Sequence, residues 1–136
     1  MTNPMLQFTK EVDYSIRLLL ALSKLKKEKF LSLHNFSEEN KISFLFLQRI
    51  AKKLREAGLI KSIKGAQGGY RLNVDFKKIT VKNLIEALEG EFAVVNCLKK
   101  GSECSRASGC SSQKVFVEIN KKFVNYLKNL RLSEII

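Results

Sequence analysis

The most constraining feature of this sequence is an amphipathic helical pattern that runs directly into a hairpin pattern. Apolar residues recur at helical spacing from Ile42 to Ala57, and Gly58 follows where a helix-ending glycine is expected. Two short alternating segments, LIKSIK and YRLNV, then flank the glycine-rich sequence GAQGG. This order predicts a helix followed at once by a small antiparallel hairpin with a glycine-rich tip.

Two further helices are predicted before this unit. Apolar residues keep helical spacing over residues 12–25, and a short helix is expected near residues 35–40, with Ser32 or Asn35 as its cap. Residues 40 and 41 then form a turn, and Ser43 is the expected N-cap of the next helix. The basic run KLKKEK that ends the first helix is interpreted as solvated.

Two more helices are predicted after the hairpin. Thr80 is the expected cap of VKNLIEALE, which Gly90 closes, and a long amphipathic helix is expected over residues 113–130. The predicted fold class is mainly α with a small β-hairpin wing, that is, a winged helix-turn-helix plus a long C-terminal dimerisation helix. The expected organisation is a winged helix-turn-helix DNA-binding domain over 1–90, a cysteine loop over 91–112, and a dimerisation helix and tail over 113–136.

The basic residues are concentrated in the same region as the helix and hairpin. The chain has 25 Lys and Arg against 13 Asp and Glu, and residues 41–82 hold eleven of these cations with only two acids. Such a balance indicates a polyanionic partner, either nucleic acid or an anionic membrane surface. The longest apolar stretch, residues 16–22, contains Arg17 and is too short to span a bilayer. The sequence therefore predicts double-stranded DNA as the partner and no membrane segment.

Candidate DNA-binding residues follow from the geometry of the winged helix-turn-helix, whose second paired helix enters the major groove N-terminus first. Gln48 is suited to adenine and Arg49 to guanine or phosphate, although any single lysine on such a helix is more often simply solvated. GAQGG lacks the Lys-Ser/Thr of a nucleotide-phosphate loop and lies between strands, which favours a wing tip. The candidates are Ser43, Phe44, Gln48, Arg49, Lys52 and Lys53 on the helix and Lys64, Gln67 and Arg71 on the wing.

Three cysteines, Cys97, Cys104 and Cys110, lie within 14 positions on a polar segment. An odd number cannot pair fully within the chain, and no signal pattern opens the sequence, so we expect a cytoplasmic protein with reduced thiols. Zinc remains possible, but the paired C-x2-C spacing of structural zinc sites is missing. Three thiolates also suit an iron-sulfur cluster, which needs a fourth ligand, and His34 is expected to be a surface or capping residue. A thiol-redox enzyme is disfavoured because no C-x-x-C pair or catalytic dyad spacing is present.

The last predicted helix carries an apolar stripe that a domain of this size has little core to receive. We therefore expect this face to pack on a second protomer and form a homodimer. The candidate dimerisation residues are Val115, Phe116, Ile119, Phe123, Tyr126 and Leu127.

These motifs together resemble the Rrf2 family of winged-helix transcription regulators over nearly the whole chain. The resemblance rests on DYSIRLLLAL in the first helix, ISFLFLQRIAKKLREAGLIKSIKGAQGGYRL through the third helix and wing, the helix end ALEG, and three cysteines before a last helix. It implies a homodimer, not an enzyme, that represses or activates promoters according to the state of an iron-sulfur cluster. In that reading Cys97, Cys104 and Cys110 are cluster ligands, and Gln48 occupies a base-discriminating position.

The fourth cluster ligand is where the sequence departs from part of the family. Members of the IscR type have a histidine three residues after the third cysteine, where this chain has Gln113. Members of the NsrR type use an aspartate in the first helix of the partner subunit, and Asp13 occupies the matching place, with Glu11 a poorer match. The resemblance leaves open a 4Fe-4S or 2Fe-2S cluster that senses iron-sulfur status, nitric oxide or redox state. It also leaves open a cluster-free member regulated by thiol oxidation or by a partner protein.

Overall fold

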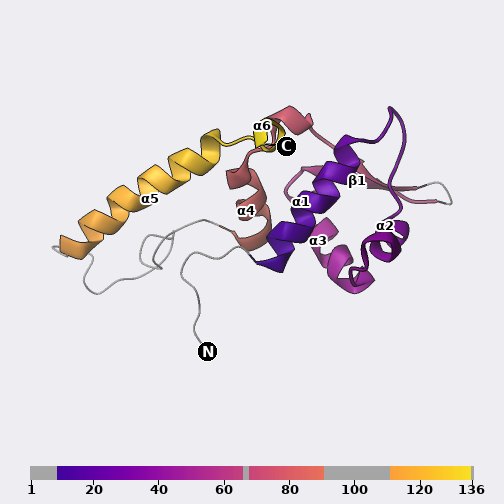
Figure 1. Ribbon diagram of the computed structural model, residues 1–136, viewed down its shortest axis with the longest axis horizontal. Coiled ribbons are helices and arrows are strands. Elements are labelled where there is room, and N and C mark those ends of the chain that lie inside the picture. The colour runs from indigo at the N-terminus through magenta and orange to yellow at the C-terminus, as the bar shows by residue number, and fades with distance from the viewer. Residues whose placement is uncertain (1–8, 66–67, 91–110, 136) are drawn as a thin grey trace.

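The computed structural model describes residues 9–65, 68–90 and 111–135, and within them a mainly helical chain carries one two-stranded antiparallel hairpin (Figure 1). The predicted fold class, a winged helix with a long C-terminal helix, is confirmed. In chain order the elements are α1 (Lys10–Ser23), α2 (Leu33–Asn40), α3 (Phe44–Glu56), β1 (Ile60–Ile63), β2 (Gly69–Leu72), the 3-10 helix η1 (Phe76–Lys78), α4 (Val81–Glu89), α5 (Ser111–Asn129) and α6 (Leu132–Ile135).

Side-chain caps fix the starts of three helices, close to where the sequence signals place them. The Ser32 hydroxyl accepts a hydrogen bond from the backbone N–H of Asn35, so Ser32 and not Asn35 caps α2. Ser43 caps α3 in the same way. Thr80 and Asn83 form a reciprocal capping box at the start of α4. Each cap satisfies a backbone donor that the helix itself leaves without a partner.

A tight turn sets the angle between α2 and α3. Lys41 adopts a left-handed backbone conformation, with φ of 54°, which costs a residue with a side chain about 1 kcal/mol. Two hydrogen bonds close the turn: Ser37 Oγ donates to the Ile42 carbonyl at 2.6 Å, and the Ile42 N–H donates to the Ser37 carbonyl at 3.1 Å. Because Ser37 and Ile42 are both buried, the turn is locked to the core.

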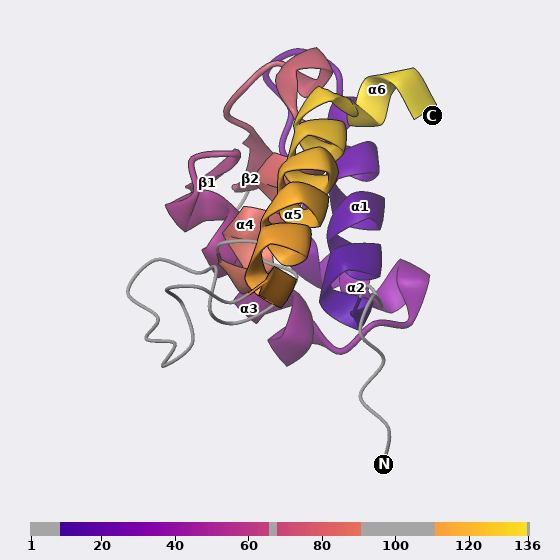
Figure 2. The same cartoon turned by 90° about the vertical axis from the view of Figure 1, so that its left-hand side faces the viewer.

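The core forms where α1, α3 and α4 pack together, as seen behind α5 in Figure 2. Aliphatic side chains repeated at helical spacing on each helix supply it, which follows from the periodicity of the sequence. The most completely buried are Leu18 and Leu19 of α1, Leu47, Ile50, Ala51 and Leu54 of α3, and Leu84 of α4. This burial uses one side of α3 and leaves its opposite side facing outwards.

The wing is more than a two-stranded hairpin. β1 and β2 pair from Ile60 opposite Leu72 to Ile63 opposite Gly69. Leu31, in the segment between α1 and α2, adds a further antiparallel bridge to Tyr70 on the outer side of β2. The base of the wing is therefore held on two sides.

The C-terminal segment fastens α5 to the body of the domain. Arg131 forms an antiparallel bridge with Thr80, and the N–H of Leu132 donates to the Ile79 carbonyl at 3.1 Å. The Leu132 side chain is buried in the core. From this attachment α5 runs away from the body (Figure 1). Neither α6 nor η1 was expected from the sequence, because segments of three or four residues are too short to show helical periodicity.

Candidate nucleic-acid interface

The outward side of α3 presents a continuous stripe of four exposed residues. Leu45, Gln48, Arg49 and Lys52 are spaced at i, i+3, i+4 and i+7, so they lie on one face of the helix. The buried residues of α3 occupy the other side. A single helix fits the major groove, so this face has the size and composition to meet base edges and phosphates.

Leu45 is the residue of this stripe to which the sequence analysis assigned no role. It lies in the first turn of α3, and 74% of its surface is exposed. An isolated exposed leucine is ordinary, but this one stands beside Gln48 on a face that is otherwise polar. An apolar side chain in that place is suited to the methyl group of thymine.

Aromatic contacts hold the first turn of α3 in place. Phe44 is half-buried and packs edge-to-face against His34, with ring centroids 5.4 Å apart. His34 itself is exposed on α2, as expected. Phe46 packs edge-to-face against Tyr14 of α1, and the Arg49 guanidinium lies 5.4 Å from the Phe46 ring centroid. Arg49 is therefore partly preorganised at the surface by a cation-π contact.

Lys53 occupies a different place from its neighbour Lys52. Its ammonium donates to both carboxylate oxygens of Glu11, at 3.1 and 3.0 Å, and to the Leu88 carbonyl at 3.2 Å. These contacts join α3 to α1 and to the end of α4, and both charged side chains are partly buried. The arrangement does not support the predicted phosphate contact of Lys53, because the charge is already neutralised within the chain. The periodicity of α3 places residue 53 about 100° round the helix from Lys52, towards the body.

The structure describes two of the three predicted wing residues, Lys64 and Arg71, together with Lys61, which was not predicted. Lys64 is exposed beside the tip, and Lys61 is exposed opposite Arg71 in the strand pairing. Arg71 is half-buried, and its guanidinium lies 5.4 Å from the Phe30 ring centroid. Gln67 lies outside the described residues. The wing thus carries cations on the strands that follow α3, and β1 is in contact with that helix.

Of the residues predicted to hold a cluster, the structure describes Asp13 but not the three cysteines. Cys97, Cys104 and Cys110 lie outside the described residues. Asp13 is on the first turns of α1 with its side chain 54% exposed, and it accepts a hydrogen bond at 3.1 Å from Arg17, which is also exposed. Glu11 is engaged by Lys53. Within residues 9–65, 68–90 and 111–135, no three His, Cys, Asp or Glu side chains come together as a metal site.

The long helix α5 exposes most of its predicted dimerisation stripe. Val115, Ile119, Phe123 and Tyr126 are exposed apolar or aromatic residues along one side of the helix. Phe116 is half-buried, and Leu127 is buried at 7% exposure, so Leu127 anchors α5 within its own chain and does not present itself to a partner. The prediction for Leu127 is thus not supported, because the fastening of α5 to the body covers that side of its last turns.

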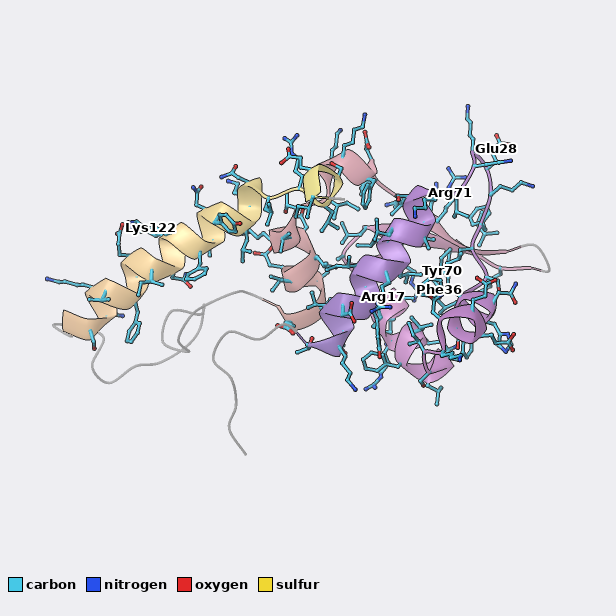
Figure 3. The ribbon with its side chains drawn as sticks, viewed as in Figure 1. Arg17, Glu28, Phe36, Tyr70, Arg71 and Lys122 are labelled. Atoms are coloured by element: carbon cyan, nitrogen blue, oxygen red, sulfur yellow. The ribbon has the colours of Figure 1, made fainter. Side chains whose placement is uncertain are left out.

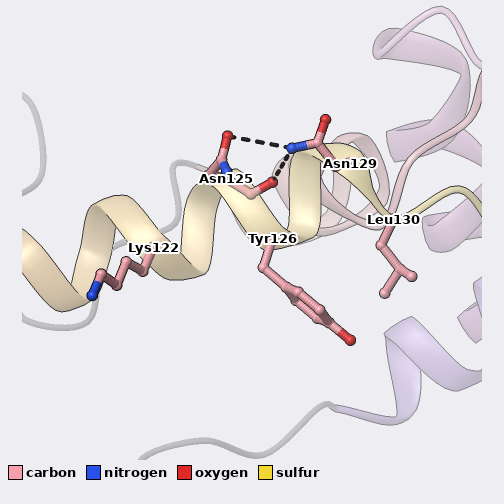
Figure 4. A pocket seen from close by; sticks show the side chains of 5 residues that line it. All are labelled: Lys122, Asn125, Tyr126, Asn129 and Leu130. Atoms are coloured by element: carbon pink, nitrogen blue, oxygen red, sulfur yellow. Dashed lines mark hydrogen bonds between the residues drawn. The ribbon is translucent and has the colours of Figure 1, made fainter.

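A surface hollow of about 340 Å³ lies beside this stripe (Figure 4). Lys122, Asn125, Tyr126, Asn129 and Leu130 line it, and Asn129 donates to Asn125 on its rim. Its lining includes no nucleophile paired with a general base and no metal ligand set, and Tyr126 belongs to both the hollow and the exposed stripe. We therefore treat the hollow as part of the α5 surface and not as a separate site.

The helix-turn-helix, the exposed stripe of α3 and the cationic wing together define a winged-helix DNA-binding protein. In the parts of the chain that the structure covers, no helix is long and apolar enough to cross a bilayer. The Rrf2 family, described as "Iron-dependent Transcriptional regulator", matches residues 8–136, and the chain belongs to this family. It is a transcription regulator of the Rrf2 type and not an enzyme.

Similar proteins agree with this assignment. The regulator IscR of Vibrio cholerae is 27% identical over 96% of this chain and 75% of its own length. The structure of CymR, "the Global Cysteine Regulator of B. subtilis", is 26% identical, with a TM-score of 0.73 over 96% of this chain and 95% of that one. The T. potens IscR structure is 27% identical, with a TM-score of 0.69 over 96% and 85% of the two chains.

The different surroundings of Lys52 and Lys53 lead to a prediction for a matched pair of variants. Lys53→Gln is expected to lower the free energy of unfolding by about 1 to 2 kcal/mol, because the Glu11 carboxylate loses its charged partner. Lys52→Gln is expected to leave unfolding within about 0.5 kcal/mol of the parent and to lower the salt slope of DNA binding by about 0.9. Urea unfolding and DNA titrations at several salt concentrations measure both quantities. If Lys53→Gln left the free energy of unfolding unchanged and reduced the salt slope, the result would support the original prediction that Lys53 contacts a phosphate.

Proposed function

We propose that this chain is a homodimeric, cytoplasmic repressor whose binding to operator DNA is controlled by an iron-sulfur cluster. The observation that carries the DNA-binding part is the exposed stripe Leu45, Gln48, Arg49 and Lys52 on α3, in a fold whose wing also carries cations. The opposite side of the same helix is buried against α1 and α4. The helix is thus rigidly held with its polar side outwards, which is the arrangement that reading a major groove requires.

Each residue of the stripe has a chemically distinct task in this proposal. Gln48 pairs its amide with the N6 and N7 positions of adenine, and Leu45 contacts the methyl group of thymine. Arg49 reaches guanine or a phosphate, and Lys52 neutralises a phosphate. Ser43 fixes the N-terminus of α3 through its cap, and the half-buried Phe44 holds the first turn against His34. Lys64, Gln67 and Arg71 serve the wing.

The dimer follows from the exposed side of α5. Val115, Ile119, Phe123 and Tyr126 line one side of the helix over residues 115–126. Antiparallel packing of two such helices removes this apolar surface from water without needing a larger core in either protomer. The two linked winged-helix domains then bind two half-sites. Once the first domain is bound, the second domain is held at a high effective concentration near its own half-site.

The donor set of this chain fits an iron-sulfur cluster. Cys97, Cys104 and Cys110 supply three thiolates, and Asp13 supplies an oxygen ligand across the dimer, which makes the four ligands that a cluster needs. Asp13 is the better choice of the two carboxylates on this turn, because its pair with Arg17 is exposed, whereas the pair of Glu11 with Lys53 is partly buried. A carboxylate is a harder ligand than a thiolate and binds iron more weakly. When bound, the cluster supplies redox-active iron that reacts with oxidants or nitric oxide.

The start of α1 connects this ligand to the reading helix. Asp13 and Glu11 lie on the first turns of α1, and Glu11 contacts Lys53 on α3. Thr9 also donates to Glu89 at the end of α4, from which residues 91–110 continue. A displacement of the start of α1 therefore acts on the orientation of α3 through the Glu11–Lys53 pair. In this proposal the dimer has two arrangements that differ in the spacing of the half-sites they fit. Binding of Asp13 to the cluster shifts the equilibrium between them.

The alternative function is a cluster-free regulator controlled by thiol oxidation or by a partner protein. The similarity to CymR of Staphylococcus aureus, whose structure is also described in an "oxidized form", favours it. The two candidates share the α3 stripe, the wing and the α5 surface, and they differ only in the role of the cysteines. Iron and acid-labile sulfide, measured on anaerobically purified protein, separate them.

The reading of bases is tested by variants within the α3 stripe. Gln48→Ala and Leu45→Ser are each expected to change the sequence enriched from a random duplex pool, with discrimination falling by about 1 to 3 kcal/mol at one base pair. Lys52→Gln is the control, since loss of a phosphate contact weakens all sequences alike. An unchanged enriched sequence in both α3 variants would remove this face from base recognition.

The cluster ligands are tested with variants purified without oxygen. The parent is expected to be brown, with broad absorption near about 400 nm and bound iron and sulfide. Cys104→Ala should lose the cluster, and Asp13→Ala should keep a less stable one with an altered spectrum. Glu11→Gln is the matched control, with a native spectrum but a lower free energy of unfolding. A native spectrum and native cluster stability in Asp13→Ala would exclude Asp13 as the fourth ligand, and a colourless parent without iron would support the cluster-free alternative.

The dimer surface is tested with Ile119→Asp, which places a charge in the middle of the exposed stripe. We expect this variant to sediment as a monomer and to lose tight binding to a two-site duplex, because burying an unpaired carboxylate is strongly unfavourable. Asn125→Asp adds the same charge on the same helix and keeps the acceptor for Asn129, so it should remain dimeric. An unchanged sedimentation mass for Ile119→Asp would show that α5 does not form the interface.

A further inference from the structure

We propose that the loop between α1 and α2, residues 24–30, is a third DNA-contacting element that binds backbone phosphates beyond the wing. The proposal rests on the DNA-binding role of α3 and the wing. It adds a surface that neither the base-reading stripe nor the region of concentrated charge at residues 41–82 includes.

The loop carries a strong positive charge that none of the acids in the described part of the chain neutralises through an ion pair. Its charged residues are Lys24, Lys26, Lys27, Glu28 and Lys29, a net charge of +3 over six positions. All five are exposed. None of the four lysines takes part in any ion pair among the residues that the structure describes. This sets them apart from Lys53 and Lys82, which are paired with Glu11 and Glu86.

The loop is attached to the wing and does not hang freely in solvent. The Leu31 N–H donates to the Tyr70 carbonyl at 2.8 Å, and the Tyr70 N–H donates to the Leu31 carbonyl at 2.9 Å. Next to this bridge, the Arg71 guanidinium lies over the Phe30 ring. Figure 3 shows Tyr70 and Arg71 at the base of the wing and Glu28 at the far end of the loop. The end of the loop is therefore fixed against the base of the wing.

Gly69 allows this attachment. A β-carbon at this position would lie 2.2 Å from the Leu31 carbonyl oxygen, far inside van der Waals contact. The approach of the two backbones thus requires a residue without a side chain. Gly69 stands in the sequence GAQGG, so part of that glycine-rich segment serves the attachment of the loop as well as the turn of the wing.

A turn fixes the lysines relative to one another. The Lys29 N–H donates to the Lys26 carbonyl at 3.0 Å, and Glu28 adopts a left-handed conformation with φ of 66°. Positive φ at the third residue of a four-residue turn is usually left to glycine, so the chain accepts local backbone strain here. A turn of defined shape holds Lys26, Lys27 and Lys29 with less conformational freedom than a flexible basic tail.

The position of the loop extends the DNA-binding surface in one direction. In Figure 1 the wing projects between the loop, above it, and α2 and α3, below it. A duplex that receives α3 in its major groove and the wing in the next minor groove continues past the wing towards the loop. Lysine ammonium groups at that place meet phosphates, which carry no base information. The loop should therefore contribute affinity and salt dependence but no sequence preference.

The test compares two triple variants of equal charge change in the full chain. The loop variant is K26Q/K27Q/K29Q, and the control, K114Q/K121Q/K128Q, removes three exposed lysines from α5. Binding to a mixed-sequence duplex of about 30 base pairs is titrated at several salt concentrations. The loop variant should lower the slope of log Kobs against log salt by about 2 to 3 and weaken binding about tenfold or more, and the control should change the slope by less than about 1.

A variant that is expected to tighten DNA binding makes the test independent of general damage to the protein. Glu28→Gln keeps the shape of the side chain and removes the one acid of the loop, so it should tighten binding to the same duplex. The sequence enriched from a random pool should be the same for the parent, the loop variant and Glu28→Gln.

Three results would overturn the proposal. They are equal effects of the two triple variants, unchanged binding by the loop variant, and weaker binding by Glu28→Gln. Failure of the parent itself to bind DNA with a salt-dependent affinity is a different outcome, because it would remove the DNA-binding role of α3 and the wing.

Discussion

Burial of the apolar side of α3 against α1 and α4 is the interaction on which the rest of this structure depends. Leu47, Ile50, Ala51 and Leu54 are fully buried, so rotation of α3 about its axis would expose aliphatic surface to water. This fixes which residues point outwards and places Leu45, Gln48, Arg49 and Lys52 on one exposed face. The exposed stripe of α3 is therefore a consequence of core packing. Its polar residues do not need contacts of their own to remain on the outer side of the helix.

A single ion pair adds direction to this packing. Lys53, Glu11 and the Leu88 carbonyl meet where α3, α1 and α4 come together, and the residues involved are 42 and 35 positions apart in the chain. Nonpolar packing tolerates small sliding movements, whereas a partly buried charge with defined hydrogen bonds favours one geometry. The same chain thus uses lysine in two ways on one helix, as a structural tie at residue 53 and as an exposed cation at residue 52.

Local signals made most of the fold predictable, and long-range contacts explain what was not. Ser43, Thr80 and Gly58 mark helix ends through interactions within a few residues, so the sequence alone locates them. The partner of Lys53, the burial of Leu127 and the bridge from Leu31 to Tyr70 depend on how distant segments meet, which periodicity does not encode. For the same reason KLKKEK reads as an ordinary solvated run until the fold places it beside the wing. The exposed faces of α3 and α5 were predictable because each follows from a single helical repeat.

The fastening of α5 at its C-terminal end makes this helix a lever. Its 19 residues span about 28 Å, and the bridge between Thr80 and Arg131 holds only the end next to the body. A tilt of about 10° at that base moves the far end by about 5 Å, which exceeds the rise of one base pair. In a dimer joined through α5, a small change in the packing of Leu132 and its neighbours would therefore shift the two winged-helix domains by more than a base-pair step. Operator spacing is in this way sensitive to a few side chains far from the DNA.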